Sequence, residues 1–188
     1  MKGFTKRIFH QEIPTEIGAD ELIVRGIMHP FFYSFSKKTI KPEAFLPAPE
    51  KNDVSLLRRN FTTDDFCKNH SQSIVIPGHQ YCGLAAFMAN AISKVDALSG
   101  FSGIAKIVGS PIDKNGNYIK SKKVFKNDPG LPMHADLLYL KPPTRGEPQT
   151  TYRKYAKEII KLSKYYSDPS PDSPGWHGQA LINESHFS

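Results

Sequence analysis

Short apolar runs separated by proline, glycine and polar residues make up most of the chain, and this pattern predicts several strands. The runs with the β-branched or aromatic content of strands are residues 21–27, 54–58, 73–76, 104–108, 118–125 and 136–140. Asn115-Gly116 lies between two of these runs and is typical of a tight hairpin turn, because both positions tolerate positive φ. Residues 82–92 are continuously apolar and are compatible with either a helix or a buried strand leading into a helix.

Two further segments have helical signals. Thr63 followed by Asp64 and Asp65 predicts a helix start, because threonine caps the first turn and the helix dipole favours acids there. In residues 148–166, apolar side chains recur at the spacing of one helix face, with lysines and arginine opposite. Most predicted strands come early in the chain and the clearest helix comes late. This order predicts an α+β fold, with a small mixed or antiparallel sheet and a C-terminal amphipathic helix.

The length of 188 residues suits one domain with appendages. We expect an N-terminal arm over residues 1–19, a single α+β domain over 20–166, and a Pro/Gly-rich tail over 167–188 that Trp176 anchors. No run reaches the length of a membrane span, and no apolar stretch follows the basic first residues, so neither a membrane partner nor secretion is expected. Two cysteines exclude a disulfide framework, which favours a cytoplasmic location.

Charge favours a polyanionic partner. Lys+Arg number 25 and Asp+Glu 18, a net charge of +7, and the excess gathers in residues 106–126 and 149–166. We expect nucleic acid or a phosphorylated ligand to bind there and at polar positions of the strands. The candidate binding residues are Arg25, His29, Ser55, Arg58, His134, Lys122, Lys123, Arg153 and Lys157.

Arg25 interrupts an apolar strand, and burying it unpaired would be costly. It therefore lies on a solvated face, pairs with an acid such as Asp136, or lines a pocket. His134 and Asp136 are two positions apart on a predicted strand and share a face, which suits an imidazole oriented by a carboxylate or a buried structural histidine.

Cys82 with His134 and Asp136 is a second candidate site. A thiol nucleophile needs a base and gains from a helix N-terminus, and the order of these residues resembles papain-like and NlpC-type peptidases. A buried core cysteine is the alternative. Cys67-x-x-His70 and His79-x-x-Cys82 have a spacing suitable for zinc, although in an order that no zinc-finger family uses, so we assign no metal ligand. No cofactor is expected.

Two resemblances bear on this sequence. Leu22–Arg25, His29-Pro30-Phe31, Val54–Arg58 and Met133–Leu137 are similar to segments of a group of short uncharacterised bacterial proteins. That resemblance implies a strand over residues 83–87 and brings no activity. The order of Arg25, Ser55 and a late polar residue on strands is similar to ADP-ribosyltransferase-like folds, although the late acid Glu158 falls in the predicted helix.

Together these observations predict a basic bacterial protein of a conflict or phage-defence kind that binds nucleic acid or a phosphorylated ligand. One alternative is a cysteine hydrolase that uses Cys82 and His134. Another is an adaptor subunit of a larger complex, in contact through the aromatic residues 31–35 or the tail.

Overall fold

The protein is described by a computed structural model over residues 11–120, 123–140 and 150–181. Its main element is a six-stranded antiparallel sheet with the order β10-β6-β2-β5-β9-β7. These strands are β2 (Leu22–His29), β5 (Asp53–Arg58), β6 (Gln80–Met88), β7 (Ala105–Gly109), β9 (His134–Tyr139) and β10 (Lys164–Ser167). None of the helices in the described ranges could cross a membrane.

Short elements surround the sheet. Two small antiparallel pairs form from β1 (Glu12–Ile13) with β8 (Val124–Phe125) and from β3 (Tyr33–Ser34) with β4 (Thr39–Ile40). The helices are α1 (Asp64–Ser73), α2 (Ala91–Asp96) and α3 (Thr150–Lys161), with 3₁₀ turns η1 (Pro42–Phe45) and η2 (Arg59–Phe61). The predicted α+β class, antiparallel sheet and late amphipathic helix are confirmed. The helix is shorter than the predicted range 148–166, because it ends at Lys161 and residues 164–166 belong to β10.

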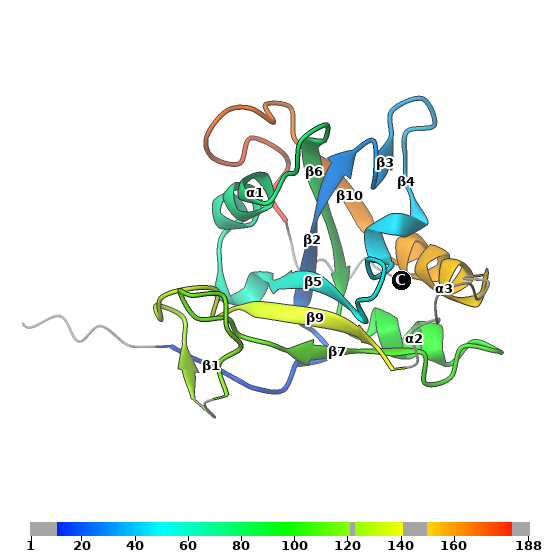
Figure 1. The fold of residues 1–188 in the computed structure, drawn as a ribbon, viewed down its shortest axis with the longest axis horizontal. Helices are drawn as coiled ribbons and strands as arrows, with labels where there is room; N and C mark the ends of the chain where they lie inside the picture. Colours follow the sequence, from blue (N-terminus) through cyan, green and yellow to red (C-terminus); the bar gives the residue numbers. More distant parts are fainter. Residues whose placement is uncertain (1–10, 121–122, 141–149, 182–188) are drawn as a thin grey trace, which may run out of the picture.

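The sheet forks between its two central strands. In the described chain, β2 and β5 pair through Ile23 with Arg58 and Val24 with Leu57. Beyond this joint the strands diverge: β2, β6 and β10 run upright in Figure 1, whereas β5, β9 and β7 run across. The sheet therefore consists of two three-stranded halves that open away from each other.

Each face of the sheet has its own core. On one face the apolar side of α3, including Tyr155 and Ile159, packs with Phe45 of η1 and Phe87 of β6. On the other face α1 packs on β2 and β6, where Cys67 and Leu84 are buried. The apolar residues of α3 lie on one side of the helix, as their spacing predicts, and that side packs on the sheet.

The C-terminal segment packs against α1. Lys68 of α1 and Asp168 form a fully buried ion pair with an N–O distance of 2.8 Å, and the Lys68 ammonium also donates to the Ser170 carbonyl. The backbone N–H of Trp176 donates to Asp65 at the start of α1, whose N-cap is Thr63, as predicted. The predicted tail is irregular, but from Asp168 to Leu181 it is part of the folded body.

Local sequence signals misplaced two strands. Residues 73–76, predicted as a strand, form the end of α1 and a turn. The Asn115-Gly116 turn exists, because the Asp113 carboxylate accepts from two backbone N–H groups within it. However, β7 pairs with β9 and β8 with β1, so the predicted hairpin is wrong beyond the bridge between Ile112 and Tyr118.

The joint of the fork contains a buried ion pair. Both Nε and Nη2 of Arg58 donate to the Glu21 carboxylate at 2.7 Å, and the guanidinium also donates to the carbonyls of Pro14 and Glu16. The backbone N–H of Leu22 donates to the Asn60 side chain across the same joint. Arg58 and Glu21 are both buried, so neither charge has water as an alternative partner.

Replacing Glu21 by Gln should lower the free energy of unfolding by about 3–5 kcal/mol, because it leaves a buried guanidinium without a counter-charge. Urea unfolding of wild type, Glu21→Gln, Arg58→Met and the double variant measures this. We expect the double variant to lose clearly less than the sum of the single losses. Strictly additive losses would show that the pair does not act as a unit.

Candidate functional site

A cavity of about 410 Å³ lies where the two halves of the sheet part, and we call it the fork cavity. Arg25 of β2 and Ser55 of β5 line it from the two sides of the fork. Phe31 and Phe32, which follow β2, Arg153 of α3 and the 46–51 loop add to the wall, and two acidic residues, Glu43 and Asp53, also line it. The cavity size falls in the range typical of small-molecule sites.

Arg25 is the first residue of β2 after the joint, which places its side chain in the fork. Its Nη1 donates to the Ser55 carbonyl at 2.6 Å, and its guanidinium lies over the Phe32 ring, 4.9 Å from the centroid. Its buried Nε has no hydrogen-bond partner among the described residues, and none of their carboxylates forms an ion pair with it. Burial lowers the pKa of Arg25 to about 10, partly opposed by the charge of Asp136, so Arg25 is charged at neutral pH.

Behind Ser55, a hydrogen-bonded histidine reaches across the strand pair. His134 of β9 lies with Nε2 2.6 Å from the Ser55 Oγ, and its Nδ1 lies 2.9 Å from both the carbonyl oxygen and the Oγ of Ser110. Burial lowers the pKa of His134, partly opposed by the nearby carboxylates of Asp136 and Asp53, so the neutral ring is favoured.

The partners of the ring assign its tautomer. A carbonyl oxygen can only accept, so Nδ1 carries the proton and donates to Ser110. Nε2 then accepts the hydroxyl proton of Ser55. This is the relation of a hydroxyl to a general base whose other nitrogen is held in place, and it polarises the Ser55 hydroxyl.

Asp136 stands beside this pair. Its Oδ1 lies 3.8 Å from His134 Nε2, and the Tyr118 hydroxyl donates to its Oδ2 at 3.3 Å. Burial raises the pKa of Asp136, with Ser110 and the charge of His134 acting in the opposite sense. Buried titratable groups whose pKa values shift toward their neutral forms gather at functional sites more often than elsewhere.

Several members of this site had no signal in the sequence. Ser110 lies in a loop, and the aromatic pair Phe31 and Phe32 could equally have been core. Burial lowers the pKa of His70 in α1, and the charges of His134 and Arg25 act in the same sense. The alternation of β9 did point to His134 and Asp136, and the structure places both on one face, as predicted.

Of the other predicted binding residues in the described structure, Arg153 lines the fork cavity and the rest lie outside it. Arg58 is engaged in the joint, and His29 lies beside Phe35 with its Nδ1 3.1 Å from the Tyr33 carbonyl. Lys123 is exposed next to β8, and Lys122 lies outside the described residues. Arg153 lines the fork cavity, paired with Glu43 at 2.7 Å, and Lys157 lies one turn further along α3.

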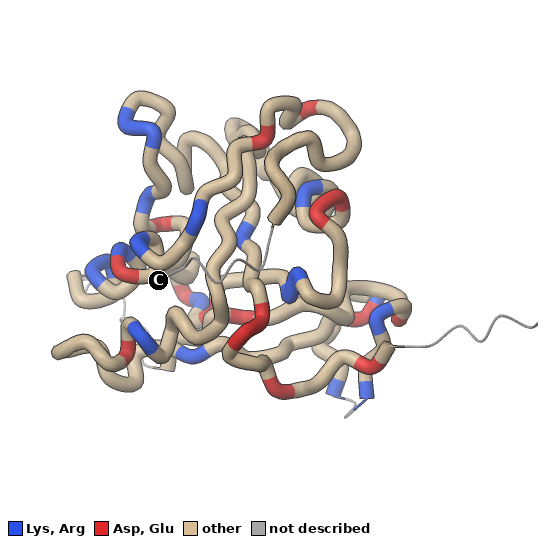
Figure 2. Tube along the Cα trace, turned by 180° about the vertical axis from the view of Figure 1, so that it is seen from behind, with Lys and Arg blue, Asp and Glu red and all other residues tan. Residues whose placement is uncertain are grey.

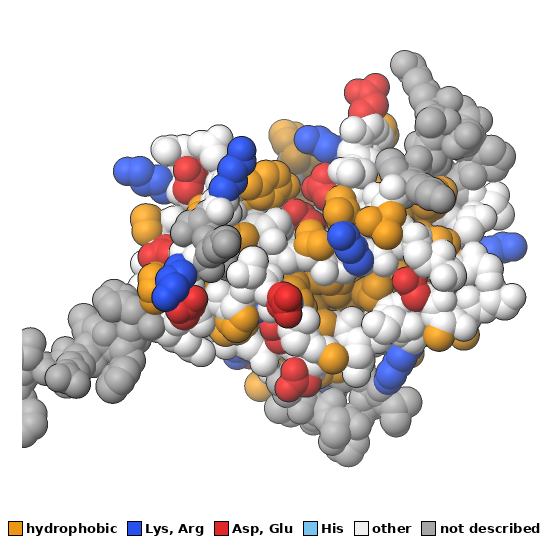
Figure 3. All heavy atoms as spheres, turned by 90° about the horizontal axis from the view of Figure 1, so that it is seen from below, with side chains coloured by type: hydrophobic (Ala, Val, Ile, Leu, Met, Phe, Trp, Pro, Cys, Tyr) orange, Lys and Arg blue, Asp and Glu red, His pale blue; other side chains and the backbone are white. Residues whose placement is uncertain are grey.

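The two lysine clusters do not form one face. β8, beside the first cluster, lies at the opposite end of the molecule from α3, which holds most of the second. Figure 2 shows basic residues at both ends, with acidic residues between them. The face in Figure 3 likewise mixes acidic and basic side chains with apolar ones. The positive charge therefore acts locally rather than as a single surface.

Cys82 and His134 form no catalytic pair. Cys82 lies within β6 rather than at a helix start, its thiol donates to the Ile27 carbonyl, and burial raises the pKa of the thiol. β2 and β5 lie between β6 and β9 in the strand order, so Cys82 and His134 belong to different halves of the fork. Residues 83–87 form part of a strand, as the first resemblance implied. The cysteine hydrolase alternative is not supported, because Cys82 and His134 do not meet.

The zinc arrangement is also not formed. In the described residues no group of three or more His, Cys, Asp or Glu side chains is placed to hold a metal ion. Cys67 and Cys82 belong to cores on opposite faces of the sheet, and burial raises the pKa of Cys67 to about 12. Both cysteines are therefore buried apolar residues.

Acid should destabilise the protein through His134. Because the pKa of His134 is lowered on folding, the unfolded chain binds the proton more readily, and the free energy of unfolding falls as pH drops below about 6.5. His134→Gln removes this proton, so between pH 7 and 5 the variant should lose less stability than wild type, by at most about 1.4 kcal/mol per pH unit. Urea unfolding at several pH values measures this, with His177→Gln as the exposed control; parallel curves for wild type and His134→Gln would contradict it.

Comparison of the chain with protein-family models, with curated proteins and with solved structures finds no match. The chemistry of the fork cavity is therefore argued from its own residues.

Proposed function

We propose that the fork cavity binds a phosphorylated nucleotide and that Arg25 holds its phosphate. The observation that carries this proposal is the charge of Arg25. It is a guanidinium removed from water, with its Nε unpartnered and no carboxylate paired to it among the described residues. A buried charge is unfavourable unless something compensates it, and an anionic ligand in the cavity supplies that compensation.

The remaining wall suits a nucleotide. Phe31 lines the cavity and is 52% exposed, so it presents an aromatic ring against which a base can stack. Arg153 adds a second cation, partly neutralised by Glu43. The Ser55 hydroxyl, held by His134, offers a polar contact for a sugar or a reacting group.

The second resemblance supports NAD⁺ as the nucleotide to test first. Arginine, serine and a late polar residue on strands are what make the sequence similar to ADP-ribosyltransferase-like folds. In the structure Arg25, Ser55 and the His134–Asp136 pair lie at the fork, where Asp136 provides the late acid in place of Glu158, which pairs with Lys161 on α3. The reaction that we propose for this site is hydrolysis of NAD⁺: water attacks C1′ of the ribose, the bond to nicotinamide breaks, and free ADP-ribose forms. The bacterial defence role stays a prediction.

Titration calorimetry with NAD⁺, ADP-ribose and ATP tests the site. We expect at least one nucleotide to bind wild type, and Arg25→Gln to bind it tenfold or more weakly, because hydrogen bonds to charged groups contribute about 1.5–3 kcal/mol. Lys106→Gln, an exposed lysine on β7, is the control of equal charge change and should bind as wild type does.

Arg25→Gln should keep its thermal midpoint, since it removes a buried charge that lacks an ion pair, and Arg25→Lys tests whether charge alone suffices. No binding of any of the three nucleotides, or equal binding by folded Arg25→Gln, would refute the proposal. If nucleotide binds but nicotinamide is not released, the site binds without the proposed reaction.

A further inference from the structure

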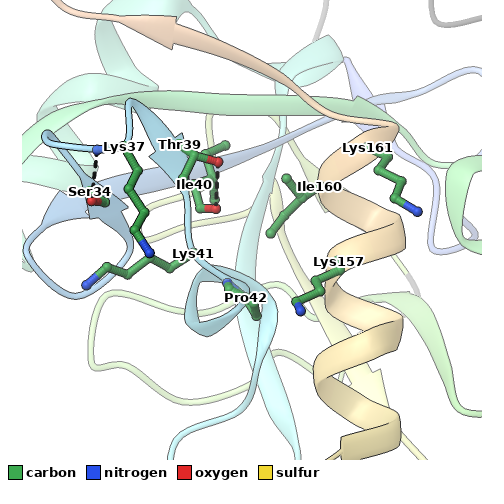
Figure 4. A pocket seen from close by; sticks show the side chains of 9 residues that line it. All are labelled: Ser34, Lys37, Thr39, Ile40, Lys41, Pro42, Lys157, Ile160 and Lys161. Atoms are coloured by element: carbon green, nitrogen blue, oxygen red, sulfur yellow. Dashed lines mark hydrogen bonds between the residues drawn. The ribbon is translucent and has the colours of Figure 1, made fainter.

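We propose that a second cavity, the lysine pocket, binds the phosphate backbone of single-stranded nucleic acid. The lysine pocket is a hollow of about 600 Å³ between the β3–β4 hairpin and α3. Lys37 and Lys41 line it from the hairpin side, and Lys157 and Lys161 line it from α3 (Figure 4). It is separate from the fork cavity, and its binding does not require a nucleotide there.

The charges of the pocket are arranged for an anion with several phosphates. Lys157 points from α3 into the hollow, whereas Lys161 turns away, as Figure 4 shows, and is paired with Glu158 at 2.6 Å. Lys41 is fixed by donating to the Pro30 carbonyl at 2.6 Å. Within the described residues no carboxylate lines this pocket, and neither Lys41 nor Lys157 forms an ion pair. The Lys41 side chain extends away from α3, so a polyanion in the hollow would meet Lys157 directly and the hairpin-side lysines, Lys37 and Lys41, at its rim.

The floor of the pocket distinguishes its ligand from a simple anion. Ile40 and Ile160 lie between the hairpin-side lysines and Lys157, so the hollow offers apolar surface with lysines at its rim. A nucleic-acid strand matches this combination, because its phosphates repeat along the backbone and its bases present apolar faces once unstacked. Lysine is a point charge without the fixed fork of arginine, so we expect phosphate contacts with little sequence preference.

The lysine pocket and the fork cavity share two elements, η1 and α3. Lys41 and Pro42 line the lysine pocket, while Glu43, the next residue of η1, lines the fork cavity. On α3, Arg153 lines the fork cavity and Lys157 the lysine pocket. The two sites therefore lie on either side of η1.

Fluorescence anisotropy with a labelled 20-nucleotide oligo(U) at 50 and 200 mM KCl tests the pocket in the full chain. The pocket variant is Lys41→Gln with Lys157→Gln. Its control is Lys106→Gln with Lys154→Gln, which removes the same charge from exposed positions outside both cavities, one of them also on α3.

We expect the pocket variant to bind at least tenfold more weakly at 50 mM KCl. Its slope of log K against log salt should fall by about 1.4, since each phosphate contact of a single strand contributes about 0.7. The control variant should stay within twofold of wild type. Circular dichroism melting checks that both variants are folded.

Equal weakening of both double variants would show that net charge alone attracts the strand and would overturn the proposal. Absence of binding to wild type at 50 mM KCl would do the same. Inorganic polyphosphate of similar length is the second probe: if it binds as tightly as oligo(U), the apolar floor contributes nothing and nucleic acid is the wrong class. Arg25→Gln should leave oligo(U) binding unchanged, which separates this result from the nucleotide site.

Discussion

The short joint between β2 and β5 is the constraint on which the rest of the structure depends. Two residue pairs hold the halves of the sheet together, and the buried Arg58–Glu21 ion pair closes the end of that joint. A longer pairing would continue the sheet flat and fill the fork with backbone hydrogen bonds. Because pairing stops after Val24, the next residue, Arg25, meets open space instead of a partner strand, and its guanidinium reaches the Ser55 carbonyl across the gap. The cavity is thus a consequence of where the ladder ends.

Two arginines on adjacent strands show how structural and ligand-binding roles differ physically. Arg58 is almost fully buried, but its donors are taken by one carboxylate and two carbonyls, and its ring partner is Phe61. Arg25 has one carbonyl and the Phe32 ring, and its Nε is left without a partner in the described structure. The Nε, Nη1 and Nη2 atoms of Arg58 each have an acceptor, whereas the Nε of Arg25, on the neighbouring strand, has none among the described residues. Burial by itself is therefore not informative about function, whereas burial with missing partners is.

Local patterns carried most of the secondary structure and part of the site. Helix α3 was predictable because its apolar spacing meets a core on one side. Strand β2 was predictable from its β-branched apolar residues, which enter the cores on both faces of the sheet, and the alternation of β9 placed His134 beside Asp136. Pairing was not predictable in the same way: the Asn115-Gly116 turn formed, yet its flanking runs joined different strands, because tertiary packing outweighed the hairpin signal. The convergence of Arg25 with Ser55 also depends on sheet order, which local periodicity does not specify, and Ser110 enters the site through a loop without any pattern.

Helix α3 contributes basic residues to both cavities. Its apolar side is buried against the sheet, which fixes the directions of its remaining side chains. Arg153 and Lys157 are four residues apart and therefore lie on the same side of the helix, one turn from each other. That single spacing sends one cation to the fork cavity and one to the lysine pocket, with η1 between them. Lys154, one position from Arg153, points elsewhere and lines neither cavity. The net charge of +7 therefore says less about ligand binding than the position of each basic residue around the helix, because that position decides which cavity the charge lines.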